Sequence, residues 1–237
     1  MDLFDNPDEY IFRILRRPCA TGIVTTFAEL KGNPEEFKDT FKWRANIPVQ
    51  THSLNVAIVD SRFKRVEDMD ALITFCEDIP IGVVTADCVP VLIHCPDVNG
   101  VAAIHAGWKG TLGGIVDRTL DVLVEHGAKP ENMVVAFGPS ISLEYYEVDA
   151  ELGNRFIEAG FGDYVSTDTP KPHIDLEGVN MDRLLRRGVN KENIKRSGFC
   201  TFSSRAENGK LLFPSYRRDG KEAGRLLSSI MLLTQLS

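Results

Sequence analysis

The sequence predicts an α+β fold: a layered α/β arrangement in which mixed, largely antiparallel sheets are flanked by helices. Short runs rich in Val and Ile, bounded by Asp, Asn, Pro or Gly, are typical of strands, and several follow one another between residues 55 and 105. Segments with apolar residues at helical spacing come mainly after residue 110. This distribution indicates an α+β fold rather than a regular βαβ repeat.

The first half of the chain contains most of the predicted strands. Residues 21–27 fit a short strand, and residues 35–41 fit a helical turn after Pro34. Stronger strand runs follow at residues 55–60, 71–76, 81–85, 89–95 and 101–105. The connections between the last three runs are too short for crossover helices, so we expect antiparallel pairing among them.

The second half alternates between helices and strands. Apolar residues recur every three or four positions in residues 112–126, and Gly127 is expected to end that helix. Further helices are predicted at residues 148–159 and 176–187, the second one ending at Gly188. Strands are predicted at residues 133–137, 199–202 and 211–215, and residues 226–233 fit either a strand or a helix.

Composition limits the kind of protein. The 237 residues contain no repeat or linker, so we expect a single domain over residues 1–237. A net charge of −7 argues against a nucleic-acid partner. No apolar run reaches the roughly 18 residues of a membrane span, and the acidic N-terminus does not resemble a signal peptide. With five cysteines and no CxxC pair, a cytoplasmic protein is expected, as a monomer or a homodimer.

His52, Cys88 and His105 form a candidate metal site. Each histidine borders a turn next to a predicted strand, and Cys88 lies where Pro90 interrupts a strand pattern. Nitrogen and sulfur ligands from separate strand ends, with one open position, are typical of catalytic zinc. The spacing alone also fits a buried cysteine with two unrelated histidines, or a nucleophilic Cys88 with a histidine base.

The other three histidines are poor ligand candidates. His94 alternates with apolar residues in a predicted strand, His126 lies at a helix end, and His173 is expected in an exposed loop.

Two further segments have features of anion sites. Residues 105–114 (HAGWKGTLGG) form a glycine-rich turn from a strand into a helix, where free backbone N–H groups and Lys109 attract anions; a tight packing turn is the alternative. In residues 215–220 (SYRRDG), Arg217 and Arg218 are candidates for clamping phosphate, against a solvated Asp-Gly turn. If this segment were a strand, only one of the two arginines would face a given site.

Several segments together resemble one known family. They are residues 50–52 (QTH), 85–92 (TADCVPVL), 105–110 (HAGWKG), 138–141 (GPSI), 146–148 (YEV), 200–201 (CT), 215–220 (SYRRDG) and 224–225 (GR). In this order they are similar to the bacterial laccase-domain or "polyphenol oxidase" family, now described as purine nucleoside phosphorylases. The resemblance covers roughly residues 50 to 233.

The resemblance implies a zinc enzyme with purine nucleosides and phosphate as substrates. It implies one zinc ion on His52, Cys88 and His105, with copper as the alternative ion. It also implies phosphorolysis of adenosine, inosine, guanosine and methylthioadenosine, some adenosine deamination, and a fold similar to certain bacterial toxin cysteine hydrolases. Five histidines are too few for a multicopper oxidase, which needs about ten.

The chain also departs from the family pattern. The usual Arg-Gly-Gly-Ser loop is not visible after Phe27, and Ser53 stands where a glycine is common. These departures fall near the expected substrate mouth, so they bear on the choice of substrate.

Catalytic roles follow as hypotheses. For deamination, zinc acidifies a water molecule that attacks C6 of adenosine, and Asp87 transfers a proton or orients a ligand histidine. Catalytic roles are therefore predicted for Cys88, Asp87 and His105. For phosphorolysis, phosphate attacks the anomeric carbon of ribose. The predicted substrate-binding residues are Gln50, Lys109, Arg217 and Arg218.

Two other functions fit the same residues. The first is a metal-free cysteine hydrolase or amidase, for example on cell-wall precursors, with Cys88 as nucleophile and a histidine as base. The second is a non-catalytic module that zinc stabilises.

Overall fold

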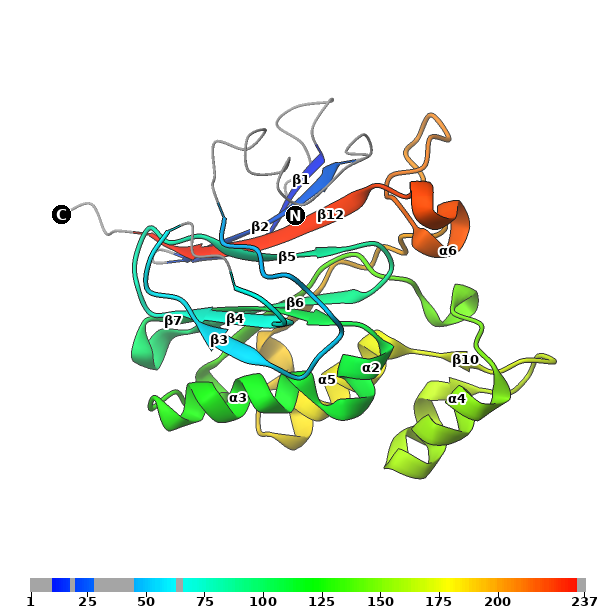
Figure 1. Ribbon diagram of the computed structural model, residues 1–237, viewed down its shortest axis with the longest axis horizontal. Coiled ribbons are helices and arrows are strands. Elements are labelled where there is room, and N and C mark those ends of the chain that lie inside the picture. Colours follow the sequence, from blue (N-terminus) through cyan, green and yellow to red (C-terminus); the bar gives the residue numbers. More distant parts are fainter. Residues whose placement is uncertain (1–9, 18–19, 28–44, 63–65, 234–237) are drawn as a thin grey trace.

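The computed structural model describes residues 10–17, 20–27, 45–62 and 66–233. Two sheets and a layer of helices lie on top of one another (Figure 1). The four-stranded sheet has the order β1-β2-β12-β5, and the six-stranded sheet has the order β11-β8-β6-β7-β4-β3. Most neighbouring strands are antiparallel, while β3 with β4 and β8 with β11 are parallel. The predicted α+β class is confirmed.

The bounds of the elements are as follows. The four-stranded sheet contains β1 (Tyr10–Arg17), β2 (Ala20–Phe27), β12 (Arg225–Leu232) and β5 (Ile81–Thr85). The six-stranded sheet contains β11 (Ile194–Arg196), β8 (Val134–Phe137), β6 (Val89–Cys95), β7 (Gly100–Ala106), β4 (Ala71–Thr74) and β3 (Val56–Ile58). A separate ladder pairs β9 (Val165–Ser166) with β10 (His173–Ile174). The α-helices are α2 (Trp108–Gly113), α3 (Ile115–Glu125), α4 (Ala150–Phe156), α5 (Leu176–Arg186) and α6 (Tyr216–Asp219).

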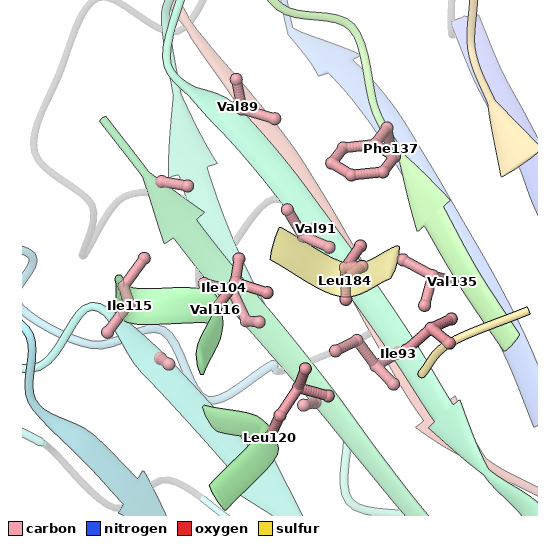
Figure 2. Packing of buried hydrophobic residues seen from close by; sticks show 14 of the residues in the cluster. Val89, Val91, Ile93, Ile104, Ile115, Val116, Leu120, Val135, Phe137 and Leu184 are labelled. Carbon is pink, nitrogen blue, oxygen red and sulfur yellow. The ribbon is translucent and has the colours of Figure 1, made fainter. Parts of the chain in front are cut away.

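The central strands of the six-stranded sheet are buried on both faces, and their side chains alternate between two cores. On β6, Val91 and Ile93 face α3 and α5, where they pack with Leu120 and the other residues labelled in Figure 2. Leu92, between them in sequence, faces the four-stranded sheet. This alternation follows from the period of two in a strand. Burial on both sides explains why β6 and β7 read as continuous apolar runs.

Most of the predicted strands are found, but one pairing is wrong. β6 and β7 are antiparallel, with Val91 opposite Ile104, as expected. β5 pairs instead with β12 of the other sheet. The chain therefore crosses from one sheet to the other at residues 86–88, where Asp87 adopts a positive φ of 87°. A short connection between two apolar runs can be a change of sheet as well as a hairpin, and the sequence does not distinguish the two.

The predicted helix over residues 112–126 is in fact two helices. Gly114 has a φ of 85° and separates α2 from α3, because only glycine adopts this conformation without strain. The helices at residues 148–159 and 176–187 correspond to α4 and α5. Asp175 begins α5 by accepting a hydrogen bond from the Gly178 N–H, and Gly188 follows its end with a φ of 89°.

Other predictions fail in the loops. Residues 199–202 and 211–215 contain only isolated bridges, at Cys200 and Leu211, in place of the predicted strands. Residues 226–233 correspond to the strand β12, and β1, β11 and α6 were missed. His173 is half-buried, and its Nδ1 lies 2.9 Å from the Leu143 carbonyl, so the expectation of an exposed loop is wrong.

The helical turn predicted at residues 35–41 lies outside the described residues. In the part of the chain that the structure describes, no helix combines the length and the apolar character needed to cross a membrane.

Candidate active site

Three side chains from separate parts of the chain converge at one end of the six-stranded sheet. His52 lies in the loop before β3, Cys88 directly precedes β6, and His105 lies in β7 opposite Pro90. Their ligand atoms all lie within 4.8 Å of one another. The Cys88 Sγ is 3.8 Å from the His52 Nε2, and the two imidazole rings meet edge to face at 4.8 Å.

The fully buried carboxylate of Asp70 lies behind both histidines. Its Oδ1 is 2.6 Å from the His105 Nδ1 and accepts a hydrogen bond from the His52 N–H at 3.1 Å. Its Oδ2 accepts hydrogen bonds from the Thr51 N–H at 3.1 Å and the Ser53 N–H at 2.6 Å. One carboxylate thus orients the ring of one histidine and fixes the backbone of the other.

The backbone at His52 needs this support. Its φ of 62° lies in the left-handed region, which costs free energy for a residue with a side chain. The hydrogen bonds from three consecutive N–H groups to Asp70 hold the chain in this conformation.

The protonation of Cys88 and His105 is coupled. Burial alone would raise the pKa of Cys88, but the neighbouring His105 and His52 lower it to about 6. Burial alone would lower the pKa of His105, but the charge of Cys88 and the hydrogen bond to Asp70 raise it to about 9. The two shifts support each other, because a thiolate on Cys88 and a protonated His105 stabilise one another.

Gly107 provides the space in which the donors meet. A Cβ atom at this position would lie 2.6 Å from the His52 Cδ2 and 3.1 Å from the Cys88 Sγ. Gly107 has an ordinary extended backbone, so its requirement for glycine is one of space rather than of conformation.

The residues fit a zinc ion. The donor set is two imidazoles and a thiolate, with three protein ligands as in catalytic zinc sites. Asp70 holds the His105 Nδ1, which leaves Nε2 as the ligand atom. A carboxylate behind a ligand histidine is the usual second partner in zinc sites, where it fixes the tautomer.

The two carboxylate oxygens of Asp87 are occupied away from the histidines. Oδ1 accepts a hydrogen bond from the Thr201 hydroxyl at 2.7 Å, and Oδ2 accepts one from the backbone N–H of Arg217 at 2.6 Å. Of the two roles predicted for Asp87, the orientation of a histidine is therefore performed by Asp70 instead. Asp87 joins the segment before Cys88 to α6.

Two of the predicted substrate-binding side chains have local partners. Both polar atoms of the Gln50 amide bind the backbone of Val84, at 2.7 Å and 2.8 Å, so this side chain fastens its loop to β5. Lys109 is exposed, and its Nζ lies 5.6 Å from the centre of the Trp108 ring.

The two adjacent arginines differ sharply. They lie in the helix α6 rather than in a strand or an Asp-Gly hairpin turn. Arg218 donates hydrogen bonds to the carbonyls of Thr201, Phe202 and Phe213 and is paired with Asp219, so it holds loops together. Arg217 is exposed; it contacts the Glu147 carbonyl at 2.8 Å, and its guanidinium lies 5.3 Å from the centre of the Tyr146 ring.

Sequence reasoning missed Asp70 and the spatial role of Gly107. Asp70 directly precedes the apolar run of β4, where it served only as a strand boundary. Asp70 could have been identified as an aspartate directly before β4, the strand beside β7, which carries His105. That inference requires the order of the strands, which the sequence alone does not give.

Known proteins with similar sequences share most of this chain. A family model described as "Multi-copper polyphenol oxidoreductase laccase" matches residues 28–233. A purine nucleoside phosphorylase of Deinococcus radiodurans is 37% identical over 177 residues, which cover 75% of this chain and 66% of that protein. A protein named adenosine deaminase from an unknown prokaryotic organism is 38% identical over 197 residues, covering 78% of this chain and 73% of its own length.

Solved structures share the fold. The chain resembles YlmD from Geobacillus stearothermophilus with a TM-score of 0.81 and 24% identity, over 98% of this chain and 99% of that one. It resembles the Bacillus licheniformis protein YfiH with a TM-score of 0.79 and 24% identity, over 91% and 93% of the two chains.

The first prediction concerns Asp70. In Asp70→Asn only one of the two side-chain atoms can accept hydrogen bonds, so the contacts to the residue 51–53 loop or to His105 are lost. We expect zinc affinity to fall by about 10- to 100-fold, measured by competition with a chromogenic chelator. Asp60→Asn changes an exposed carboxylate just after β3 and serves as the control. Equal zinc affinity in the two variants would contradict the role of Asp70.

The second prediction concerns Gly107. A methyl group there would push His52 away from Cys88, so Gly107→Ala should weaken zinc binding by about tenfold or more. Gly162→Ala is the control, because its new methyl group lies in ordinary contact 3.9 Å from Ile157. Calorimetric titration with zinc measures both, and an unchanged affinity for Gly107→Ala would show that His52 has room to move.

Proposed function

The chain belongs to the family described as multi-copper polyphenol oxidoreductase laccase, and from that premise we propose that it is a zinc-dependent enzyme of purine nucleosides. Its activity is phosphorolysis of adenosine, inosine, guanosine and methylthioadenosine, with adenosine deamination as a second activity. The names of the relatives, purine nucleoside phosphorylase and adenosine deaminase, support the substrate class. The observation that carries the proposal is the convergence of His52, Cys88 and His105 around one point.

Zinc is preferred to copper for reasons of chemistry and number. Among the described residues, one group of His, Cys, Asp or Glu can hold a metal, and it offers three ligands. The whole sequence has five histidines, of which His126 and His173 already contact backbone carbonyls through Nδ1. A cluster of several copper ions needs about ten histidines, so this donor set does not fit the multi-copper centre named in the family description.

The chain prepares this site before any ligand arrives. When bound, zinc supplies a Lewis acid that stabilises negative charge and activates an oxygen nucleophile. The thiolate form of Cys88 is the form that binds metal, whereas His105 must release its proton to become a ligand. Asp70 keeps the ring of His105 in place while that proton leaves.

Arg217 is the side chain that we assign to the phosphate co-substrate. The backbone N–H of Arg217 donates a hydrogen bond to Asp87, the residue before Cys88. The helix α6 is therefore attached directly to the segment that carries the thiolate. The guanidinium is exposed and has fork-shaped N–H donors that match phosphate oxygens. Arg218, which forms hydrogen bonds to three carbonyls, is assigned to the support of the loops.

One observation favours a second candidate, a metal-free cysteine hydrolase or amidase. Cys88, His105 and Asp70 are arranged as nucleophile, base and orienting carboxylate, with Asp70 holding the Nδ1 of His105 at 2.6 Å. The lowered pKa of Cys88 suits a thiolate nucleophile. A cysteine hydrolase has no need for a second histidine, but the His52 Nε2 lies 3.8 Å from the same sulfur. We therefore favour the metal site over the cysteine hydrolase.

The third prediction tests the activity itself. We expect the zinc-loaded protein with adenosine and phosphate to release adenine, because three ligands leave an open position for substrate. Products are separated by chromatography, with and without phosphate. Cys88→Ala should abolish adenine release, whereas Cys76→Ala, which changes a half-buried cysteine outside the site, should not.

The alternatives give different results in the same assay. Inosine formation without phosphate indicates deamination as the main activity. Adenine release that survives chelation of zinc contradicts the metal-centred proposal. Zinc binding without turnover of any purine nucleoside indicates a structural zinc module, and hydrolysis that resists chelators but stops on thiol alkylation indicates the cysteine hydrolase.

The fourth prediction separates the two arginines. Arg217→Ala should raise the KM for phosphate by about tenfold or more and leave the unfolding midpoint nearly unchanged, because its side chain is exposed. Arg218→Ala should instead lower the free energy of unfolding, by about 1–3 kcal/mol, because buried acceptors lose a charged donor. Steady-state kinetics and urea unfolding of both variants decide the matter; an unchanged KM in Arg217→Ala contradicts the assignment.

A further inference from the structure

Thr201 is a fully buried residue whose hydroxyl group reaches the segment before Cys88. Its Oγ1 donates a hydrogen bond to the Asp87 Oδ1 at 2.7 Å, although the two residues are 114 positions apart in sequence. Its N–H donates to the Ser140 carbonyl at 3.0 Å, which fixes the backbone of Thr201 itself. A contact of this kind has to be kept, because a buried carboxylate oxygen without a donor is costly.

The hydroxyl of Thr201 fixes the direction of the Asp87 carboxylate. A carboxylate accepts hydrogen bonds but cannot donate them, so each of its oxygens needs a donor when it is buried. Asp87 is 7% exposed, and its donors are the Thr201 hydroxyl on Oδ1 and the backbone N–H of Arg217 on Oδ2. Because Thr201 holds Oδ1, the carboxylate cannot rotate freely, and Oδ2 stays directed at Arg217.

The helix α6 depends on contacts from outside itself. It has four residues, which are too few for a helix that is stable alone. The N–H groups of a first helical turn have no partner within the helix, and the Arg217 N–H finds its acceptor in Asp87 at 2.6 Å. The Thr201 carbonyl also accepts a hydrogen bond from the Arg218 guanidinium at 3.2 Å. Thr201 therefore holds the start of α6 by two routes.

The position of Cys88 has separate support. The Asp87 carbonyl accepts a hydrogen bond from the Ile141 N–H at 2.9 Å, so the backbone before Cys88 is held without the Asp87 side chain. The two ligand histidines are held by Asp70. Loss of the Thr201 hydroxyl should therefore affect α6 and leave the three metal donors in place.

We propose that Thr201 is a positioning residue for the phosphate co-substrate. Its hydroxyl orients the Asp87 carboxylate, which in turn fixes the backbone of Arg217 beside the segment that carries Cys88. The inference rests on the proposed function, in which the Arg217 guanidinium binds phosphate. Thr201 is buried and does not itself bind phosphate, so its substitution changes the position of a charge without removing that charge.

The test replaces the hydroxyl of Thr201 by a methyl group of similar size. In the zinc-loaded full chain, Thr201→Val should raise the KM for phosphate by about threefold to tenfold, because a displaced Arg217 binds phosphate less well. The kcat at saturating phosphate and the zinc affinity, measured by calorimetric titration, should stay within about twofold of those of the unaltered protein. Thr201→Ser retains the hydroxyl and should keep the KM low.

Thr119→Val is the matched control. Thr119 is equally buried, and its hydroxyl donates to the Ile115 carbonyl within α3 at 2.8 Å. Each valine variant loses one buried hydrogen bond, so both should unfold at lower urea concentration. Only Thr201→Val should raise the KM for phosphate.

Amide hydrogen exchange tests the contact independently of any activity. The Arg217 N–H should exchange faster in Thr201→Val than in Thr119→Val, because its acceptor is no longer held in place. NMR of the isotope-labelled protein follows this one amide.

The outcomes separate this inference from the proposed function. Unchanged exchange and KM in Thr201→Val, or an equal rise of the KM in Thr119→Val, would overturn the positioning role. In the Arg217→Ala background, Thr201→Val should raise the KM no further, and an additive rise would also overturn that role. Faster exchange with an unchanged KM in both Thr201→Val and Arg217→Ala would instead overturn the assignment of phosphate to Arg217.

Discussion

The buried carboxylate of Asp70 is the interaction on which the rest of the site depends. It binds a side-chain nitrogen of one histidine and the backbone of the loop that carries the other. A carboxylate with no exposure to solvent is costly unless its lone pairs are filled, and here both oxygens accept hydrogen bonds. The buried carboxylate of Asp70, directly before β4, therefore fixes the position of His52 relative to His105, although the two ligands are far apart in sequence.

The crossing between the two sheets provides the third ligand. Residues 86–88 connect β5 of one sheet to β6 of the other. Cys88 therefore lies at the end of this connection, directly before β6. Asp87, with its positive φ, anchors this crossing to Thr201 and to α6. The residue next to the thiolate thus holds together the loops at residues 141 and 201 and the helix α6.

The sequence predicted what depends on neighbours along the chain and missed what depends on partners across it. Runs of Val and Ile identified β4, β6 and β7, and helical spacing identified α3 and α5, because burial on one or both faces leaves a periodic pattern. The metal triad was predicted with the help of family resemblance. Asp70, Gly107 and the change of sheet at β5 were not, because their roles depend on strand order and on distances between loops.

The position of β12 has a consequence for how the protein reaches this structure. β12 lies between β2 and β5, so it pairs residue 226 with residue 85 and residue 232 with residue 20. On a ribosome, β12 emerges after β1, β2 and β5, and until then no strand lies between β2 and β5. Such long-range contacts give a high contact order and slow folding. Until β12 is in place, the unpaired edges of β2 and β5 are exposed to other chains.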